Sequence, residues 1–176
     1  MNPLENLLSD PSVLVVLVPL LGLIVGSFLN VVILRLPVMM EQGWRRECCE
    51  LLEQPAPENE PHIGLVTPNS RCPHCGVAIK PWHNIPVISW LLLRGRCAAC
   101  QAPISARYPI VELVTGLLSL AAVLAFGTSS QMMAALLMIW SLVALTGIDI
   151  DTQLLPDSIT LPLLWLGLLI NLNGVF

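Results

Sequence analysis

A stretch without a single charged side chain, residues 11–34, constrains the fold of this chain more than any other feature. A helix needs about 20 mainly apolar residues to cross the hydrocarbon core of a bilayer, and this stretch exceeds that length. Three further apolar stretches follow at 108–126, 131–148 and 158–176, and Glu112 is the one charged residue among them. Only 11% of the whole chain is charged, against about 25% in soluble domains. We therefore expect an all-α, polytopic membrane protein with four spans.

The basic residues of the chain are confined to one interval. All eight Lys and Arg residues lie between positions 35 and 107. Cytoplasmic loops of membrane proteins carry an excess of Lys and Arg, so this contrast predicts that the segment 37–107 is cytoplasmic. The N-terminus and the turn at 127–130 are then expected outside, and the acidic connector 149–157 is expected on the cytoplasmic face.

These patterns divide the chain into three parts. Residues 1–36 hold the N-terminal segment and the first span, and they lack the basic region that begins a secretory signal peptide. Residues 37–107 hold all six cysteines and most of the charge, which predicts a small extramembrane domain. Within it, the polar and proline-rich stretch 50–61 is typical of a flexible loop. Residues 108–176 hold three spans and the acidic connector 149–157.

Two CxxC pairs predict a metal site in the loop domain. Each pair can form a tight turn whose two thiolates hold one metal ion, and two such turns complete a tetrahedral site that suits Zn²⁺. A closed four-thiolate site leaves no open coordination position, so we expect a structural role. The competing interpretation is that the pairs cycle as disulfides, which the predicted cytoplasmic location disfavours. The candidate ligands are Cys72, Cys75, Cys97 and Cys100.

Acidic residues near the predicted membrane boundary are candidate site residues, because charges there are costly and often functional. Two carboxylates that share one proton can activate water, but Asp149 and Asp151 are two positions apart and would not face each other on a helix. The alternative is that these acids solvate a turn, and Asp157 suits the first turn of a helix. Glu112, about one turn inside the second span, could reach the interface or bind a cation. Asn30 indicates an interhelical hydrogen bond or a site residue.

Several ordered motifs together resemble the type IV prepilin peptidases, also called prepilin leader peptidase/N-methyltransferases. The resemblance runs through the whole chain. The motifs are GSFLNVVI at 26–33, RLP at 35–37, the two CxxC pairs, RYP at 107–109, VEL at 111–113, DID at 149–151 and LLPD at 154–157.

The resemblance implies an aspartic endopeptidase of the bacterial inner membrane. Such an enzyme removes the basic leader from type IV prepilins and type II secretion pseudopilins after a Gly. It then methylates the new N-terminal residue with S-adenosylmethionine. By the family's pattern Asp149 is the first catalytic aspartate. The neighbouring Asp151 is a further catalytic candidate. For methylation, Glu112 is the candidate to meet the sulfonium or accept a proton.

One departure from the family's pattern matters for activity. The family's second catalytic aspartate lies in a GxGD motif, and this sequence contains no GxGD. A single aspartate cannot form the proton-sharing pair, so we expect that these 176 residues are an incomplete portion and inactive alone.

Two functions of other classes remain open from the residues. One is a zinc-stapled, non-enzymatic membrane scaffold, and the other is a membrane thiol oxidoreductase. Binding of nucleic acid is disfavoured, because the basic residues are interleaved with acidic ones in the same loop. The resemblance implies prepilins and pseudopilins as partners, and the apolar stretches imply the lipid bilayer.

Overall fold

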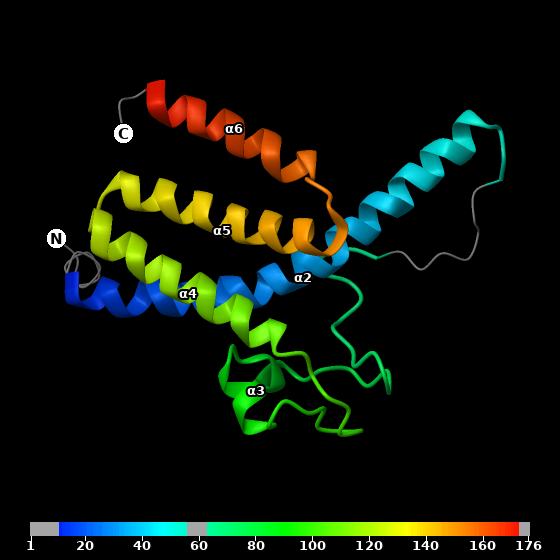
Figure 1. The fold of residues 1–176 in the computed structure, drawn as a ribbon, viewed down its shortest axis with the longest axis horizontal. Coiled ribbons are helices and arrows are strands. Elements are labelled where there is room, and N and C mark those ends of the chain that lie inside the picture. Colours follow the sequence, from blue (N-terminus) through cyan, green and yellow to red (C-terminus); the bar gives the residue numbers. More distant parts are fainter. Residues whose placement is uncertain (1–10, 56–62, 173–176) are drawn as a thin grey trace.

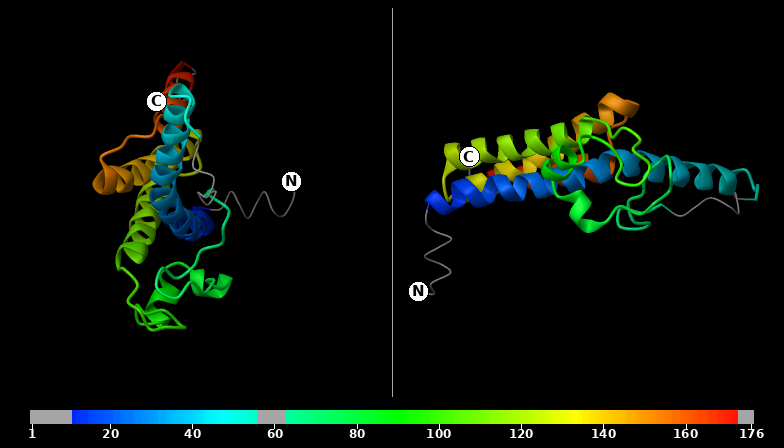
Figure 2. Two further views of the ribbon diagram at one scale, coloured as in Figure 1. Left: turned by 90° about the vertical axis from the view of Figure 1, so that its right-hand side faces the viewer. Right: turned by 90° about the horizontal axis from the view of Figure 1, so that it is seen from below.

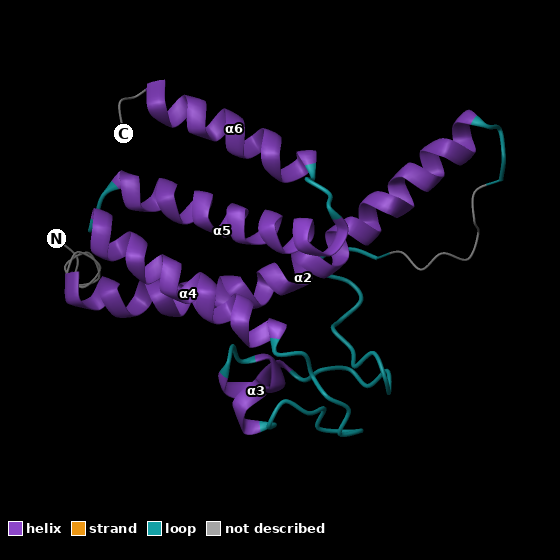
Figure 3. Cartoon of the chain, in the orientation of Figure 1, coloured by secondary structure: helices purple, strands orange, loops and turns teal. Residues whose placement is uncertain are grey.

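The computed structural model describes residues 11–55 and 63–172 and is built mainly of helices (Figures 1 and 3). Within these ranges no residue belongs to a β-strand, although isolated antiparallel bridges join Arg71 to Ala78 and Arg96 to Pro103. The prediction of an all-α chain is confirmed. The elements in chain order are α2 (Pro11–Leu51), the 3-10 helix η1 (Pro81–Asn84), α3 (Ile88–Leu92), α4 (Arg107–Phe126), α5 (Ser130–Thr152) and α6 (Asp157–Leu172).

Three of the helices, α2, α4 and α5, are long and apolar enough to cross a membrane. The mean hydropathies of their most apolar segments are 2.6, 2.1 and 2.0. Helix α6 is also apolar but is shorter, with 16 residues. The end of the predicted fourth span, 173–176, lies outside the described residues. The prediction of a polytopic helix bundle is thus confirmed, with three to four helices that could cross a membrane.

Helix α2 is longer than the sequence indicated. We expected the helix to end near residue 36 and a loop domain to begin at 37, but α2 continues to Leu51 and contains both Pro19 and Pro37. Residues 38–51 lack proline and are rich in Met, Glu, Gln and Arg, which have high helix propensity. The segment is too polar to continue the membrane span, but it can continue the helix. This second half of α2 projects beyond the bundle (Figure 1). Of the predicted flexible stretch 50–61, residues 56–61 lie outside the described part.

Helix α5 likewise extends into the predicted acidic connector. It ends at Thr152, so Asp149 and Asp151 lie in its last turn rather than in a loop. Gln153 terminates the helix in the left-handed conformation, with φ of 55°, and its N–H donates to the carbonyl of Asp149. Asp157 lies in the first turn of α6, as its position in the sequence indicated.

Two glycines of α2 lie directly against α4. A Cβ atom added to Gly22 would lie 2.8 Å from the Cβ of Ser119, and one added to Gly26 would lie 2.8 Å from the Cα of Glu112. Small residues spaced four apart let helix backbones approach this closely in membranes. Gly22 and Gly26, a GxxxG pair, therefore let the backbones of α2 and α4 approach closely.

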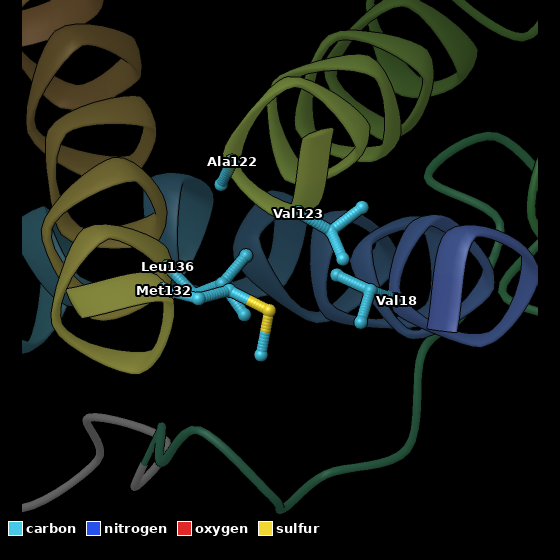
Figure 4. Packing of buried hydrophobic residues seen from close by; sticks show 5 residues of the cluster. All are labelled: Val18, Ala122, Val123, Met132 and Leu136. Atoms are coloured by element: carbon cyan, nitrogen blue, oxygen red, sulfur yellow. The ribbon is translucent and has the colours of Figure 1, made fainter. Parts of the chain in front are cut away.

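The apolar core lies between α2, α4 and α5, which run side by side in Figure 2. At the end of the bundle near the α4–α5 turn, five buried side chains pack together (Figure 4). The outward faces remain apolar, and Ile24, Leu117 and Leu169 are more than half exposed, as expected for side chains that meet lipid. The core cluster comprises Val18, Ala122, Val123, Met132 and Leu136.

Candidate functional site

The four cysteines of the CxxC pairs converge into one cluster, as the spacing predicted. Their sulfur atoms all lie within 4.8 Å of one another, and the Sγ atoms of Cys72 and Cys100 are 3.8 Å apart. This donor set could hold a metal ion, and four thiolates at such distances fit the tetrahedral preference of Zn²⁺. The cluster comprises Cys72, Cys75, Cys97 and Cys100.

The two CxxC pairs adopt the same local structure. In the first, the N–H of Gly76 donates to the carbonyl of Cys72, and the backbone then returns to form the Arg71–Ala78 bridge. In the second, the N–H of Gln101 donates to the carbonyl of Cys97, and the matching bridge joins Arg96 to Pro103. Gly76 and Gln101 both have positive φ, which such a tight turn requires. Two equivalent turns that present paired thiols are what a ribbon-like metal site needs.

Backbone amides favour the thiolate form of one cysteine in each pair. Hydrogen bonds from the N–H groups of Cys75 and His74 lower the pKa of Cys72 to about 6. The N–H groups of Cys100 and Ala99 lower the pKa of Cys97 in the same way. The thiolate is the form that ligates metals. These backbone hydrogen bonds therefore favour the binding of a metal cation.

The two predicted catalytic aspartates occupy different environments at one end of the bundle. Asp149 is exposed in the last turn of α5. Asp151 forms an ion pair of 2.5 Å with the Nη1 atom of Arg107, the first residue of α4. Within the part of the chain that the structure describes, no hydrogen bond joins the two aspartates. Their separation by two helical positions explains why they do not form a carboxylate pair.

Glu112 is buried where the loop domain meets the membrane helices. Its Oε2 atom accepts a hydrogen bond of 2.7 Å from the backbone N–H of Val87, and the side chain of Ser27 also hydrogen-bonds to this carboxylate. Val87 immediately precedes α3 and has φ of 58°, which is rare for a β-branched residue. The carboxylate therefore joins α2, α4 and the loop domain at one point.

Two further polar residues hold this junction together. The side-chain amide of Asn30 donates to the carbonyl of Tyr108 at 3.1 Å, which confirms the predicted interhelical hydrogen bond. Arg35 donates to the carbonyls of Gly64 and Pro68 at 2.9 and 2.8 Å and so ties the loop to α2. No role for Arg35 or Val87 was predicted from the sequence, because each of these contacts involves backbone atoms, which carry no residue-specific signal.

A cavity of about 740 Å³ lies at this junction. Its walls come from α2, from the start of α4 and from the loop domain between Ser70 and Ser105. Polar lining residues include Ser27, Asn30 and Glu112, and the loop contributes apolar and basic side chains. Neither the size nor the composite lining was predicted from the sequence.

Comparison with known families identifies the chain. Residues 20–126 match the bacterial peptidase A24 N-terminal domain. The chain belongs to the bacterial A24 peptidase family. Residues 136–176 match the type IV leader peptidase family in addition, so the two A24 matches together run from α2 into α6. The predicted membership of the prepilin peptidases is confirmed.

Several A24 relatives carry the name prepilin leader peptidase/N-methyltransferase. The protein of that name from Stutzerimonas stutzeri is 55% identical over all 176 residues, which cover 61% of its length. That of Pseudomonas aeruginosa is 52% identical over 98% of this chain and 60% of its own length. That of Neisseria gonorrhoeae is 52% identical over 96% of this chain and 61% of its own length. The chain thus spans about three fifths of these relatives, and no solved structure matches it.

Proposed function

We propose that this A24 chain carries part of a prepilin leader peptidase/N-methyltransferase of the bacterial inner membrane. Its substrates are type IV prepilins and the pseudopilins of type II secretion, cleaved after a Gly. The observation that carries the proposal is the position of Asp149, which family resemblance marks as catalytic, in the last turn of α5 at the end of the bundle where the loop domain lies. A basic leader on the cytoplasmic side would meet its carboxylate there.

In the peptidase reaction, Asp149 acts as the general base. Its ionised carboxylate takes a proton from water as the water oxygen attacks the scissile carbonyl, and a second, protonated carboxyl group donates to the carbonyl oxygen. The family's second aspartate belongs to a GxGD motif that these 176 residues do not contain. The proposal therefore concerns Asp149 as one half of a pair. A Gly at the cleavage point helps the substrate backbone leave its helix.

Asp151 has a supporting role in this proposal. The guanidinium of Arg107 holds its carboxylate, and the pair links the start of α4 to the last turn of α5. A carboxylate so engaged is less suited to take a proton from water. The prediction that Asp151 is itself catalytic remains a prediction, and the ion pair favours a positioning role instead.

The second proposed reaction is methylation of the new N-terminal amine. S-adenosylmethionine supplies the methyl group from its sulfonium centre. The neutral amine attacks that methyl carbon, the carbon–sulfur bond breaks with both electrons left on sulfur, and the amine loses a proton. Glu112 is the carboxylate proposed to face the cationic centre or to accept this proton.

The proposed metal is Zn²⁺ with a structural role. Four thiolates would fill its coordination sphere and leave no position for water or substrate. Held by Cys72, Cys75, Cys97 and Cys100, the zinc would join the two CxxC turns and keep the loop domain folded. The predicted orientation, with the loop domain cytoplasmic and the N-terminus periplasmic, is part of the same proposal and follows from the confinement of basic residues.

Substitution of Asp149 tests the peptidase proposal. The protein is produced from its own gene in a strain without another prepilin peptidase, and leader removal is followed by mass spectrometry of the pilin. Asp149→Asn is expected to slow cleavage at least about 100-fold, because general acid–base catalysis contributes on that scale. Asp157→Asn, in the first turn of α6, is the matched control. Unchanged cleavage by Asp149→Asn would favour the scaffold interpretation.

A further inference from the structure

The loop domain carries an exposed apolar face beside the membrane helices. We infer that this outer face lies in the interface of the same bilayer, with its apolar side chains among the acyl chains and its basic neighbours at the lipid phosphates. The inference needs neither of the proposed reactions, and it concerns a surface outside the thiol cluster and the cavity. The outer face comprises Trp82 of η1 and Ile88, Leu91 and Leu92 of α3.

Helical spacing brings three of these side chains to one side of α3. Ile88, Leu91 and Leu92 are three and four positions apart, which places them on the same helix face. The other side of α3 is turned to the loop domain, where the buried hydroxyl of Ser89 donates to the carbonyl of Trp82 at 2.8 Å. The part of the chain that the structure describes leaves the outer face uncovered, with Trp82 61% and Leu92 78% exposed.

The position of the loop domain along the bundle brings the outer face to the membrane boundary. Val87, directly before α3, donates to the carboxylate of Glu112. Residue 112 lies five positions, or about 7 Å, along α4 from its first residue, Arg107. Helix α3 therefore lies beside the end of the bundle rather than beyond it, as Figure 1 shows. Lipid that covers the exposed side chains of Ile110 and Leu113 is at the same level.

The charge of the loop domain suits a lipid surface. Residues 63–106 contain no Asp or Glu, and Lys80, Arg94 and Arg96 flank the outer face in the sequence. All three are exposed, and no ion pair holds any of them within residues 11–55 and 63–172. Basic residues near a membrane surface are attracted to its anionic lipids. The Nζ atom of Lys80 also lies 5.5 Å from the ring centroid of Trp82, a residue type enriched at membrane interfaces.

The length of α3 fits a segment that lies on a membrane. With five residues it cannot cross the hydrocarbon, but its apolar side chains can enter the boundary between headgroups and acyl chains. Exposed apolar patches mark surfaces that bind proteins or membranes, and lipid is the neighbour already present at this level. The loop domain is then attached to the bundle twice, through the Val87–Glu112 hydrogen bond and through lipid.

Quenching of tryptophan fluorescence by brominated lipids tests this contact. The full chain is reconstituted in nanodiscs of phosphatidylcholine and phosphatidylglycerol with bromine on the acyl chains near the headgroups. Subtracting the emission of the Trp82→Tyr protein isolates Trp82, which should lose most of its emission to the bromine. Trp44, isolated in the same way with Trp44→Tyr, is the control, because it is exposed on the projecting part of α2 and should keep its emission. Equal Trp82 emission with and without bromine would overturn the inference.

Substitution of two leucines tests the apolar side chains. Leu91→Ser combined with Leu92→Ser should reduce the quenching of Trp82 to the level of Trp44, because the outer face no longer favours the acyl chains. Leu51→Ser combined with Leu52→Ser is the matched control, since these leucines are exposed at the end of α2 and should leave the quenching unchanged. Full quenching of Trp82 in the first variant would overturn the inference.

Photolabelling of the unaltered protein avoids any effect of substitution on folding. Phosphatidylglycerol with a photoactivatable group near its headgroup should label peptides that cover 82–92 more than peptides from 38–51. Phosphatidylcholine with the same group should label 82–92 less, because the basic side chains then lose an anionic partner. Equal labelling by the two lipids would overturn the role of the basic residues. Absence of label from 82–92, or cross-links from 82–92 to a second copy of the chain, would overturn the inference as a whole.

Discussion

The carboxylate of Glu112 in α4 accepts a hydrogen bond of 2.7 Å from the backbone N–H of Val87 in the loop domain. This contact crosses 25 positions of sequence and joins the membrane helices to the segment that carries the thiol cluster. The loop domain is thus docked on the bundle through a buried polar contact, and several consequences can be measured.

Removal of the acceptor should loosen the docking of the loop domain. Glu112→Ala leaves the partly buried N–H of Val87 without its partner, at a cost of about 1–3 kcal/mol. Hydrogen exchange at residues 85–92 should then become faster. Glu112→Gln, which retains an oxygen acceptor, should stay close to the unaltered rate. Equal protection in all three proteins would contradict a docking role for this bond.

The thiol cluster should hold one zinc ion in each chain. Elemental analysis of the purified protein should find stoichiometric zinc, and Cys72→Ser combined with Cys97→Ser should lose it, because only two thiolates remain. Cys48→Ser is the matched control, since Cys48 is an exposed cysteine outside the cluster. Chelation should also increase proteolysis of residues 63–106. A reversible disulfide within the cluster, without bound metal, would support the oxidoreductase alternative instead.

The ion pair between Arg107 and Asp151 should contribute little to stability. Both side chains are about one third exposed, at 33% and 30%, so solvent screens their attraction. A double-mutant cycle with Arg107→Ala and Asp151→Ala should give a coupling free energy below about 1 kcal/mol. In the pilin cleavage assay, Asp151→Asn should reduce the rate far less than Asp149→Asn. Equal losses from the two substitutions would indicate that Asp151 is catalytic rather than positioning.

The approach of α2 to α4 should depend on the size of residue 26. Gly26→Ala places a methyl group 2.8 Å from the Cα of Glu112, so the helices must separate, at a cost of about 1–3 kcal/mol. Gly43→Ala is the matched control in the same helix, because nothing lies within 4 Å of its added Cβ. It should be neutral or stabilise by up to about 1 kcal/mol. Thermal unfolding in detergent measures both effects.

The helix lengths illustrate where sequence patterns lose accuracy. The hydrophobic runs located α2, α4, α5 and α6 correctly, because only apolar segments of such length can bury a helix in lipid. They underestimated the lengths of α2 and α5. The first polar residues mark where the membrane ends, but the helix can continue beyond them. Residues 38–51 stay helical through favourable propensity, and Asp149 remains in the last turn of α5.

The sequence by itself determined the membrane helices, the cysteine ligand set and the motifs that place the chain in the A24 family. Each of these is local in sequence: a run of apolar residues, a CxxC spacing, or a short ordered motif. Tertiary structure alone decided that Glu112 meets Val87, that Arg107 holds Asp151, and that a cavity forms between the loop domain and two helices. All three features join segments that are distant in the sequence. The Glu112–Val87 contact uses a backbone amide, and the cavity is formed by surfaces of several segments. Neither kind of contact leaves a recognisable pattern in the sequence.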